Sequence, residues 1–199
     1  MTGTGGILNQ AETILPTEWG EFIFSAFTDD KGDYLPHLCL RHPEMDLNQP
    51  VWVRIHSECI TGDVFHSLKC DCGEQLNSAM KILSEKKGIL IYLRQEGRGI
   101  GIINKIKAYQ HQEKGLNTIE ANEALGLKAD YRDYSAASQI MKSLGITKIN
   151  LITNNPEKIK DLRKNDIEIV SRVPLIIEPN ERNRDYLHTK KTSLGHFLK

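Results

Sequence analysis

The chain has 199 residues, of which 26 are lysine or arginine and 26 are aspartate or glutamate, so its formal net charge is zero. This length suffices for one well-filled core, and the balanced charge excludes a global attraction to nucleic acid or to an anionic membrane. The sequence has no apolar run long enough for a membrane span and no signal-peptide pattern. We therefore expect a cytoplasmic protein that binds neither nucleic acid nor a membrane.

The first residues are rich in Gly, Thr and Asn and show no period, which predicts a flexible N-terminus over residues 1–14. A single domain is expected over residues 15–199. Alternating polar and apolar residues predict strands at 21–27 and 34–40, and an Asp-Asp-Lys-Gly turn between them favours an antiparallel pair.

A third strand is expected at 51–55. Its apolar residues Val51, Val53 and Ile55 share one face because successive side chains of a strand point to opposite sides. Arg54 then lies on the other face, and the strand leads directly to a cysteine-containing stretch.

That stretch holds Cys59, Cys70 and Cys72, spaced C-x10-C-x-C. Three thiolates leave one position of a tetrahedral zinc open, which is typical of a catalytic site that binds water. Two alternatives remain open. A fourth ligand such as His56 or His66 would close the site and make it structural, and free cysteines are also common as small buried hydrophobic residues. Cys39, between two leucines, is assigned to the core.

After residue 50 strands and helices alternate. A helical apolar period marks 74–87, with Gly88 at its end, and a continuous apolar run of strand length follows at 89–93. An apolar strand at 148–152 follows the helix at 135–144. This order predicts an α/β fold in which a mixed sheet is flanked by helices and extended by an antiparallel N-terminal part. The expected elements are helices at 74–87, 101–114, 118–125 and 135–144, and strands at 89–93, 148–152 and 167–173.

Two strand-to-helix turns are candidate anion sites, because the start of a helix presents free N–H groups. The first is the glycine-rich turn at 94–101, and the second is Thr153-Asn154-Asn155 before Pro156. Any single cation near them could be a solvated surface charge. Four cations together, however, would suit a triphosphate, because guanidinium and ammonium groups bind phosphate oxygens. These four candidate contacts are Arg54, Arg94, Arg98 and Lys158.

Neither turn carries the P-loop or the dinucleotide-binding pattern, so those enzyme classes are excluded. Asp130 and Arg132 belong to a dense charged segment. From the residues alone this segment is either part of a site or a loop that caps the helix after it.

Four ordered motifs resemble the GTP cyclohydrolase II family. They are R-I-H-S-E-C at 54–59, K-C-D-C-G-E-Q at 69–75, R-Q-E-G-R-G-I-G at 94–101 and T-N-N-P-E-K at 153–158, followed by Tyr186-Leu187-x-Thr189-Lys190 and Gly195-His196. The resemblance runs from about Leu15 to the end. It implies an enzyme that opens the imidazole ring of GTP, releases formate and pyrophosphate, and begins riboflavin biosynthesis.

The resemblance also implies the site residues. Zinc, one ion per chain, would be held by Cys59, Cys70 and Cys72, and magnesium would accompany GTP. Gln75, whose amide both donates and accepts, could read an edge of the base. The implied GTP contacts are Arg54, Ile55, His56, Ser57, Glu58, Gln75, Glu96, Gly97, Arg98, Thr118, Thr153 and Lys158.

Three catalytic roles follow from matching positions. Asp130 would accept a proton, Tyr109 would supply one to the opening ring, and Arg132 would attack the α-phosphate. Arginine is always protonated and is a poor nucleophile, so stabilisation of the phosphoryl transition state is the alternative for Arg132. For Tyr109 the alternative is an ordinary buried helix tyrosine.

The resemblance further implies a homodimer. The residues before Leu15 are too few for the dihydroxybutanone-phosphate synthase that precedes some relatives, so a monofunctional chain is expected. The competing hypothesis is a catalytically inactive, zinc-stabilised module that binds guanine nucleotides. Such a module would be expected to lack a cysteine, Asp130 or Arg132, and all five are present.

Overall fold

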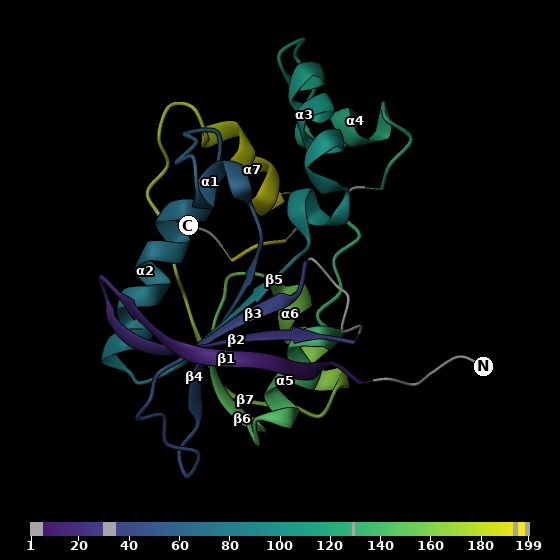
Figure 1. The fold of residues 1–199 in the computed structure, drawn as a ribbon. Coiled ribbons are helices and arrows are strands. Elements are labelled where there is room, and N and C mark those ends of the chain that lie inside the picture. The colour runs from purple at the N-terminus through teal and green to yellow at the C-terminus, as the bar shows by residue number, and fades with distance from the viewer. Residues whose placement is uncertain (1–5, 30–34, 129, 193–194, 198–199) are drawn as a thin grey trace, which may run out of the picture.

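The computed structural model describes residues 6–29, 35–128, 130–192 and 195–197. In this part of the chain seven strands form one mixed sheet in the order β1-β2-β3-β5-β4-β6-β7 (Figure 1). The first three strands and β5 pair antiparallel, whereas β5, β4, β6 and β7 run parallel. The strands are β1 Leu8–Thr17, β2 Gly20–Thr28, β3 His37–Arg41, β4 Val51–Ser57, β5 Ile89–Leu93, β6 Lys148–Ile152 and β7 Glu168–Val173.

Helices cover both faces of the sheet and its upper edge (Figure 1). They are α1 Ile60–Asp63, α2 Cys72–Glu85, α3 Gly101–Gln112, α4 Thr118–Glu123, α5 Ser135–Ser143, α6 Pro156–Lys164 and α7 Arg184–Thr192, with the 3-10 turn η1 Glu96–Gly99 before α3. The expected α/β fold with a mixed sheet and an antiparallel N-terminal part is confirmed. No helix in the described residues combines the length and apolarity that crossing a membrane would require.

Strand β1 corrects the expectation of a flexible N-terminus up to residue 14. It begins at Leu8, which pairs with Thr28 of β2, and continues to Thr17. Its side chains are mostly exposed, so the strand is held by backbone hydrogen bonds and has no apolar period to reveal it. Residues 1–5, and most of the turn expected before residue 34, lie outside the described residues.

The sheet separates two apolar clusters. On one face Val53 and Ile55 of β4, both fully buried, pack with Ile140 and Met141 of α5. On the other face Ala79, Met80 and Leu83 of α2 pack with Leu90 of β5 and Phe22 of β2. These α2 residues are those of the predicted helical period. Arg54 is thus on the α2 face, as the alternation along β4 predicted.

Helix α2 ends without a glycine in a left-handed conformation. Lys87 has φ 52° instead. Gly88 is needed for a different reason: a Cβ there would lie 2.5 Å from the carbonyl oxygen of Trp52. The glycine allows the chain to pass close to β4 as it enters β5.

Candidate functional site

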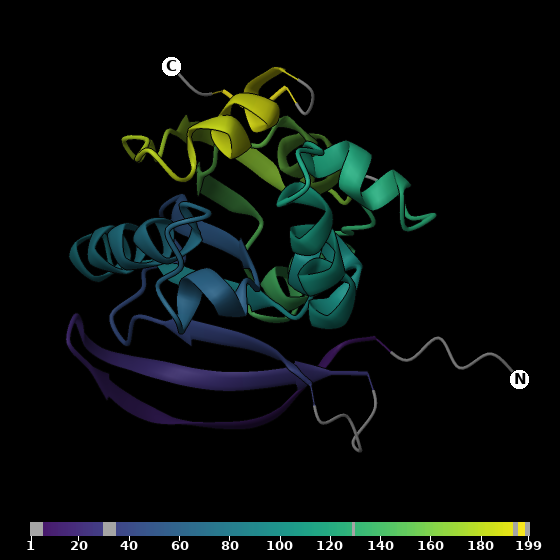
Figure 2. The same ribbon diagram turned by 90° about the horizontal axis from the view of Figure 1, so that it is seen from above.

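A cavity of about 420 Å³ lies where β4, β5 and β6 end. The carboxyl ends of these parallel strands lie at one edge of the sheet, and β4 lies between β5 and β6. Ligands of α/β sheets commonly bind at the carboxyl ends of the strands, where the chain goes from one strand to neighbours on either side of it. Helices α2, α3 and α7 surround this edge (Figure 2). Sixteen of the residues expected in the site line the cavity: Arg54, His56, Ser57, Glu58, Cys59, Cys70, Cys72, Gln75, Glu96, Gly97, Arg98, Tyr109, Thr118, Arg132, Thr153 and Lys158.

Two expected residues, Ile55 and Asp130, do not line the cavity. The Ile55 side chain belongs to the core, and only its carbonyl oxygen faces the site, where it accepts a hydrogen bond from Lys158 Nζ at 2.6 Å. Arg94 also differs from expectation. It forms an ion pair with Glu58 at 3.0 Å and is not among the lining residues.

The three cysteines converge on one point. Their sulfurs lie within 4.8 Å of one another, and Cys59 Sγ and Cys70 Sγ are 3.7 Å apart. Zinc–sulfur bonds of about 2.3 Å at tetrahedral angles place two sulfurs roughly 3.8 Å apart. The residues therefore fit a zinc ion, and of the described His, Cys, Asp and Glu no fourth joins the group. This geometry favours an open site over one closed by a histidine.

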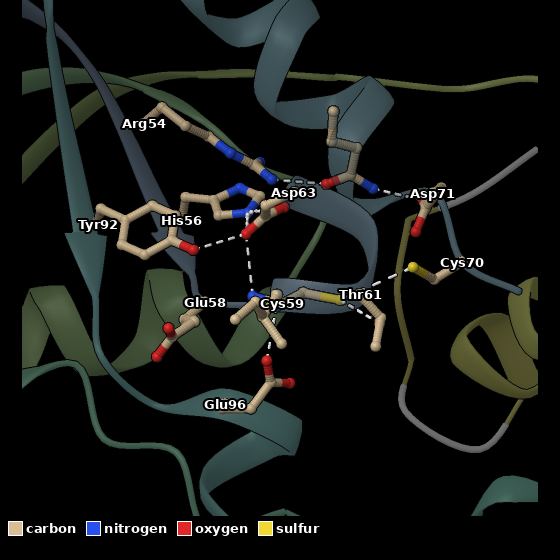
Figure 3. A network of polar contacts seen from close by, with 12 residues as sticks. Arg54, His56, Glu58, Cys59, Thr61, Asp63, Cys70, Asp71, Tyr92 and Glu96 are labelled. Carbon is tan, nitrogen blue, oxygen red and sulfur yellow. Dashed lines mark hydrogen bonds and ion pairs between the residues drawn. The ribbon is translucent and has the colours of Figure 1, made fainter. Parts of the chain in front are cut away.

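Asp63 holds the backbone at the first cysteine (Figure 3). Its carboxylate accepts hydrogen bonds from Cys59 N at 2.9 Å and from the Tyr92 hydroxyl at 2.8 Å. His56 Nε2 lies 3.0 Å from the same carboxylate, so this nitrogen donates. Burial lowers the pKa of His56, and the neutral ring leaves Nδ1 as a buried acceptor without a partner.

Two glycines bring α1 and α2 together around the cysteines. A Cβ on Gly73 would lie 2.3 Å from the carbonyl oxygen of Gly62, and a Cβ on Gly62 would lie 2.9 Å from Cys70 Sγ. Neither position tolerates a side chain without movement of backbone or ligand. The pattern of glycines beside Thr61 and Cys72 therefore sets how closely the three sulfurs approach.

Glu96 is fully engaged by the protein. Its Oε2 accepts a hydrogen bond from Ile60 N at 2.6 Å, and its Oε1 accepts from Gly97 N at 2.7 Å and Lys105 Nζ at 2.8 Å. The carboxylate thus connects the turn before α3 to the backbone beside Cys59. These bonds indicate a supporting role for Glu96 in addition to the GTP contact implied by the resemblance.

One part of the cavity lining, called its cationic end below, holds several lysines and arginines. Lys158 is 5 % exposed, and both burial and the nearby charges of Arg54, Arg132 and Lys190 lower its pKa. Arg98 also lines the cavity, and its two terminal nitrogens are buried without a hydrogen-bond partner. Unpartnered buried guanidinium donors are costly, so this end is suited to an anionic ligand.

The pKa of His196 is also affected by these lysines and arginines. Burial, together with the charges of Lys190, Arg132 and Lys158, lowers its pKa to about 3. The side chain is therefore neutral at physiological pH beside several cations. An anion placed among them would remove most of this repulsion.

Arg132 is fixed by Asp130 in a forked arrangement. Its Nε lies 2.9 Å from Asp130 Oδ1 and its Nη2 2.5 Å from Oδ2. Burial opposes the charge of Arg132, but the hydrogen bonds that it donates to Asp130 prevail and raise its pKa. A guanidinium held in this way stays protonated, which favours charge stabilisation over nucleophilic attack.

Both the oxygen and the nitrogen of the Gln75 side-chain amide form hydrogen bonds. Its Oε1 accepts from Arg54 Nη2 at 2.5 Å, and its Nε2 donates to Asp71 Oδ2. Asp71 in turn accepts from Lys190 Nζ of α7 at 2.6 Å. The amide therefore orients Arg54, and reading a base edge is left to the lone pair and N–H that remain.

The two candidate anion sites differ. At the first, Gly97, Arg98 and Gly99 all have positive φ, and the start of α3 has no side-chain cap. In the turn before it, Gly97 N already donates to Glu96 Oε1 and Gly99 N to the Gln95 carbonyl oxygen. At the second, Asn155 already caps α6 by accepting from Glu157 N. Thr153 and Asn154 line the cavity there, but the Asn154 amide is bonded to the backbone of Leu175 and Thr153 Oγ1 accepts from Asn155 N.

Several lining residues escaped the sequence analysis. Lys105 has a detectable signal, since it lies one helical turn before Tyr109 and so shares its face of α3. The C-terminal segment that contains α7 is polar and shows no clear apolar period, so its motif alone marks it. Tyr186, Thr189, Lys190 and His196 belong to that motif but were given no role, and Arg182 was not singled out.

Comparison with known proteins agrees with this site. The family model described as GTP cyclohydrolase II matches residues 9–174. The GTP cyclohydrolase-2 of Buchnera aphidicola subsp. Schizaphis graminum is 52% identical over 94% of this chain and 95% of its own, and that of Hamiltonella defensa subsp. Acyrthosiphon pisum is 51% identical over 95% and 96%.

Other relatives are longer. The riboflavin biosynthesis protein RibBA of Bacillus cytotoxicus is 50% identical over 96% of this chain, which spans 48% of that relative; the chain thus covers about half the length of the RibBA proteins it matches. Among solved structures, RibBX, a two-domain 3,4-dihydroxy-2-butanone 4-phosphate synthase from A. baumannii, aligns over 89% of the chain with a TM-score of 0.48 and 15% identity, which is too little to bear on the assignment. The model match and the full-length relatives are decisive: the chain belongs to the GTP cyclohydrolase II family.

Proposed function

We propose that this protein is a zinc-dependent hydrolase that opens the imidazole ring of GTP. It would release formate and pyrophosphate and leave 2,5-diamino-6-(5-phosphoribosylamino)pyrimidin-4(3H)-one, the first step of riboflavin biosynthesis. The observation that carries the proposal is that one cavity is lined both by three converging cysteines and by a cluster of buried cations. The names of the two full-length relatives support the same activity.

Zinc, held by Cys59, Cys70 and Cys72, supplies an activated water molecule when bound. The protein's own groups would then handle protons. Burial raises the pKa of Tyr109 to about 12, so its hydroxyl remains protonated and can donate to a nitrogen of the opening ring. Tyr109 lies on the cavity wall beside the cysteines, which is the placement such a donor needs.

The cationic end would bind the triphosphate together with magnesium. Arg98, with its two unpartnered terminal nitrogens, and the buried Lys158 face this part of the cavity. Arg132, oriented by Asp130, would stabilise charge on the α-phosphate as pyrophosphate leaves. Asp130 would then act mainly by holding Arg132, since its oxygens are already engaged by that side chain.

The assembly and location are further parts of the proposal. We infer a homodimer in the cytoplasm that binds neither nucleic acid nor membrane. The zero net charge supports the lack of nucleic-acid binding. Exposed apolar residues such as Ile103 at 68% and Phe65 at 72% support self-association. Sedimentation of the purified protein tests the dimer directly.

The activity is tested by incubating the protein with GTP, zinc and magnesium. Formate and pyrophosphate should appear in equal amounts, and the ultraviolet spectrum should shift as the purine opens. Cys59→Ser should abolish formate release, whereas Cys39→Ser, at a cysteine remote from the cavity, should retain it if the protein is folded. No formate from the zinc-loaded wild type would contradict the proposal, as would turnover in the zinc-free Cys59 variant.

A further inference from the structure

Lys105 of α3 lies against the metal ligands. Its Nζ is 3.1 Å from Cys59 Sγ, 2.8 Å from Thr61 Oγ1 and 2.8 Å from Glu96 Oε1. The residue is 9 % exposed. An ammonium group has three N–H donors, and three acceptors surround this one, so no donor is left for a substrate.

We propose that Lys105 is a positioning residue of the metal centre, which donates a hydrogen bond to the Cys59 thiolate and offsets the negative charge of the three-cysteine ligand set. This inference rests on the proposed zinc site. Three thiolates and one Zn²⁺ carry a net charge of −1 in a partly buried place. The neighbouring ammonium offsets part of the negative charge, which the Glu96 carboxylate beside it increases.

The arrangement is asymmetric among the three ligands. In the described part of the chain, Lys105 is the one cation within hydrogen-bonding distance of a cysteine sulfur, and it reaches Cys59 alone. A hydrogen bond to a thiolate withdraws electron density from sulfur, so the metal bound to it becomes more electron-poor. Lys105 thereby favours an electrophilic metal without touching the substrate.

Glu96 completes the arrangement by fixing Lys105. The carboxylate that accepts from Lys105 Nζ also accepts from Ile60 N, the amide next to Cys59. One carboxylate therefore sets both the position of the ammonium and that of the ligand it contacts. Groups of this kind around a metal site typically change its affinity by roughly tenfold to a hundredfold when removed.

The test compares Lys105→Met with the wild type and with Lys107→Met, a matched control on the exposed face of the same helix. Zinc affinity is measured by competition with a chromophoric chelator, without substrate. Lys105→Met should bind zinc roughly tenfold to a hundredfold more weakly, and Lys107→Met should match the wild type. Unchanged zinc affinity in folded Lys105→Met would overturn the proposal.

A spectroscopic measurement separates the hydrogen bond from general loosening of the site. In the cobalt-substituted protein, loss of the bond should raise the energy of the sulfur electrons and move the sulfur-to-cobalt charge-transfer band to longer wavelength. Lys105→Leu, which also lacks a donor, carries the test by itself should the methionine variant not fold, and an unshifted band with unchanged affinity would refute the role of Lys105. A wild type that binds no zinc would instead refute the metal site and hence the proposed function.

Discussion

The ammonium of Lys190 lies 2.6 Å from Asp71 Oδ1, although 119 residues separate the two in sequence. Asp71 stands between the metal ligands Cys70 and Cys72, and Lys190 lies on the C-terminal helix α7. The two side chains are only 2 % and 11 % exposed. This ion pair therefore joins α7 to the loop that carries Cys70 and Cys72, which we call the metal loop. The position of the cavity wall formed by α7 depends on this ion pair.

Replacing Lys190 with methionine should destabilise the protein by about 3 kcal/mol, because Asp71 would be left buried without its counter-charge. Lys191→Met, at the exposed neighbouring position, should change little. Urea denaturation measures both. Asp71→Asn combined with Lys190→Met should cost less than the sum of the single variants, and strictly additive effects would show that the pair is not coupled.

The effect of Lys190 should depend on pH. Burial would raise the pKa of Asp71, but the charge and hydrogen bond of Lys190 prevail and lower it. A lowered folded pKa means that this stabilisation is fully present above the ordinary aspartate value of about 4 and is lost as pH falls through the folded value. The stability difference between wild type and Lys190→Met should accordingly shrink below about pH 4.

His196 offers a direct probe of the cationic end of the cavity. Its pKa of about 3 in the free protein lies below the ordinary value, so the unfolded chain binds its proton more readily. Stability should therefore rise as pH rises from about 3 to about 6.5. Histidine NMR signals, assigned with His196→Gln, should show this pKa and its increase when pyrophosphate is added. A pKa that pyrophosphate leaves unchanged would exclude anion binding there.

The close approach of Gly73 to Gly62 makes another prediction. In Gly73→Ala the new methyl would meet the Gly62 carbonyl oxygen, so α1 and α2 must separate and the cysteine sulfurs with them. We expect a loss of about 1–3 kcal/mol in stability together with weaker zinc binding. Glu74→Ala, at the exposed next residue, is the control. A full equivalent of tightly bound zinc in Gly73→Ala would contradict this account.

How far the sequence predicts the fold depends on burial. The strands at 89–93 and 148–152 have the bounds that the sequence predicts. The first is a continuous apolar run, and the second carries the buried residues Ile149, Leu151 and Ile152; neither is an edge strand. Strand β1 and helix α7 were not predicted. The first is exposed on most of its length, and the second is polar and uses a buried lysine whose partner comes from the distant metal loop.

The residues of the site also differ in how far the sequence predicts them. The cysteines and Arg98 carry their chemistry in the residue type and its spacing, so they could be found from the motifs. Asp63 and Lys105 are common charged residues whose importance comes from what they contact: Cys59 N in the first case, Cys59 Sγ in the second. Such contacts exist only once β4, η1 and α3 have been brought together.

Arg132 allows the two proposed roles to be separated. Lysine at this position keeps the positive charge but loses the planar fork that Asp130 holds. If Arg132 stabilises charge on the α-phosphate, Arg132→Lys should retain measurable turnover and Arg132→Met should lose roughly a hundredfold or more. Both variants should bind zinc like the wild type, since the residue does not contact the cysteines.

The nucleophilic role makes the opposite prediction. A covalent guanylyl group would have to form on residue 132 during turnover, and mass spectrometry of rapidly quenched wild-type enzyme would detect it. We expect no such adduct, because the hydrogen bonds that Arg132 donates to Asp130 raise the pKa of Arg132 and keep its nitrogens protonated. An adduct on Arg132, together with complete loss of pyrophosphate release in Arg132→Lys, would establish nucleophilic catalysis. Turnover by Arg132→Lys without an adduct leaves the guanidinium as a charged support for the leaving pyrophosphate.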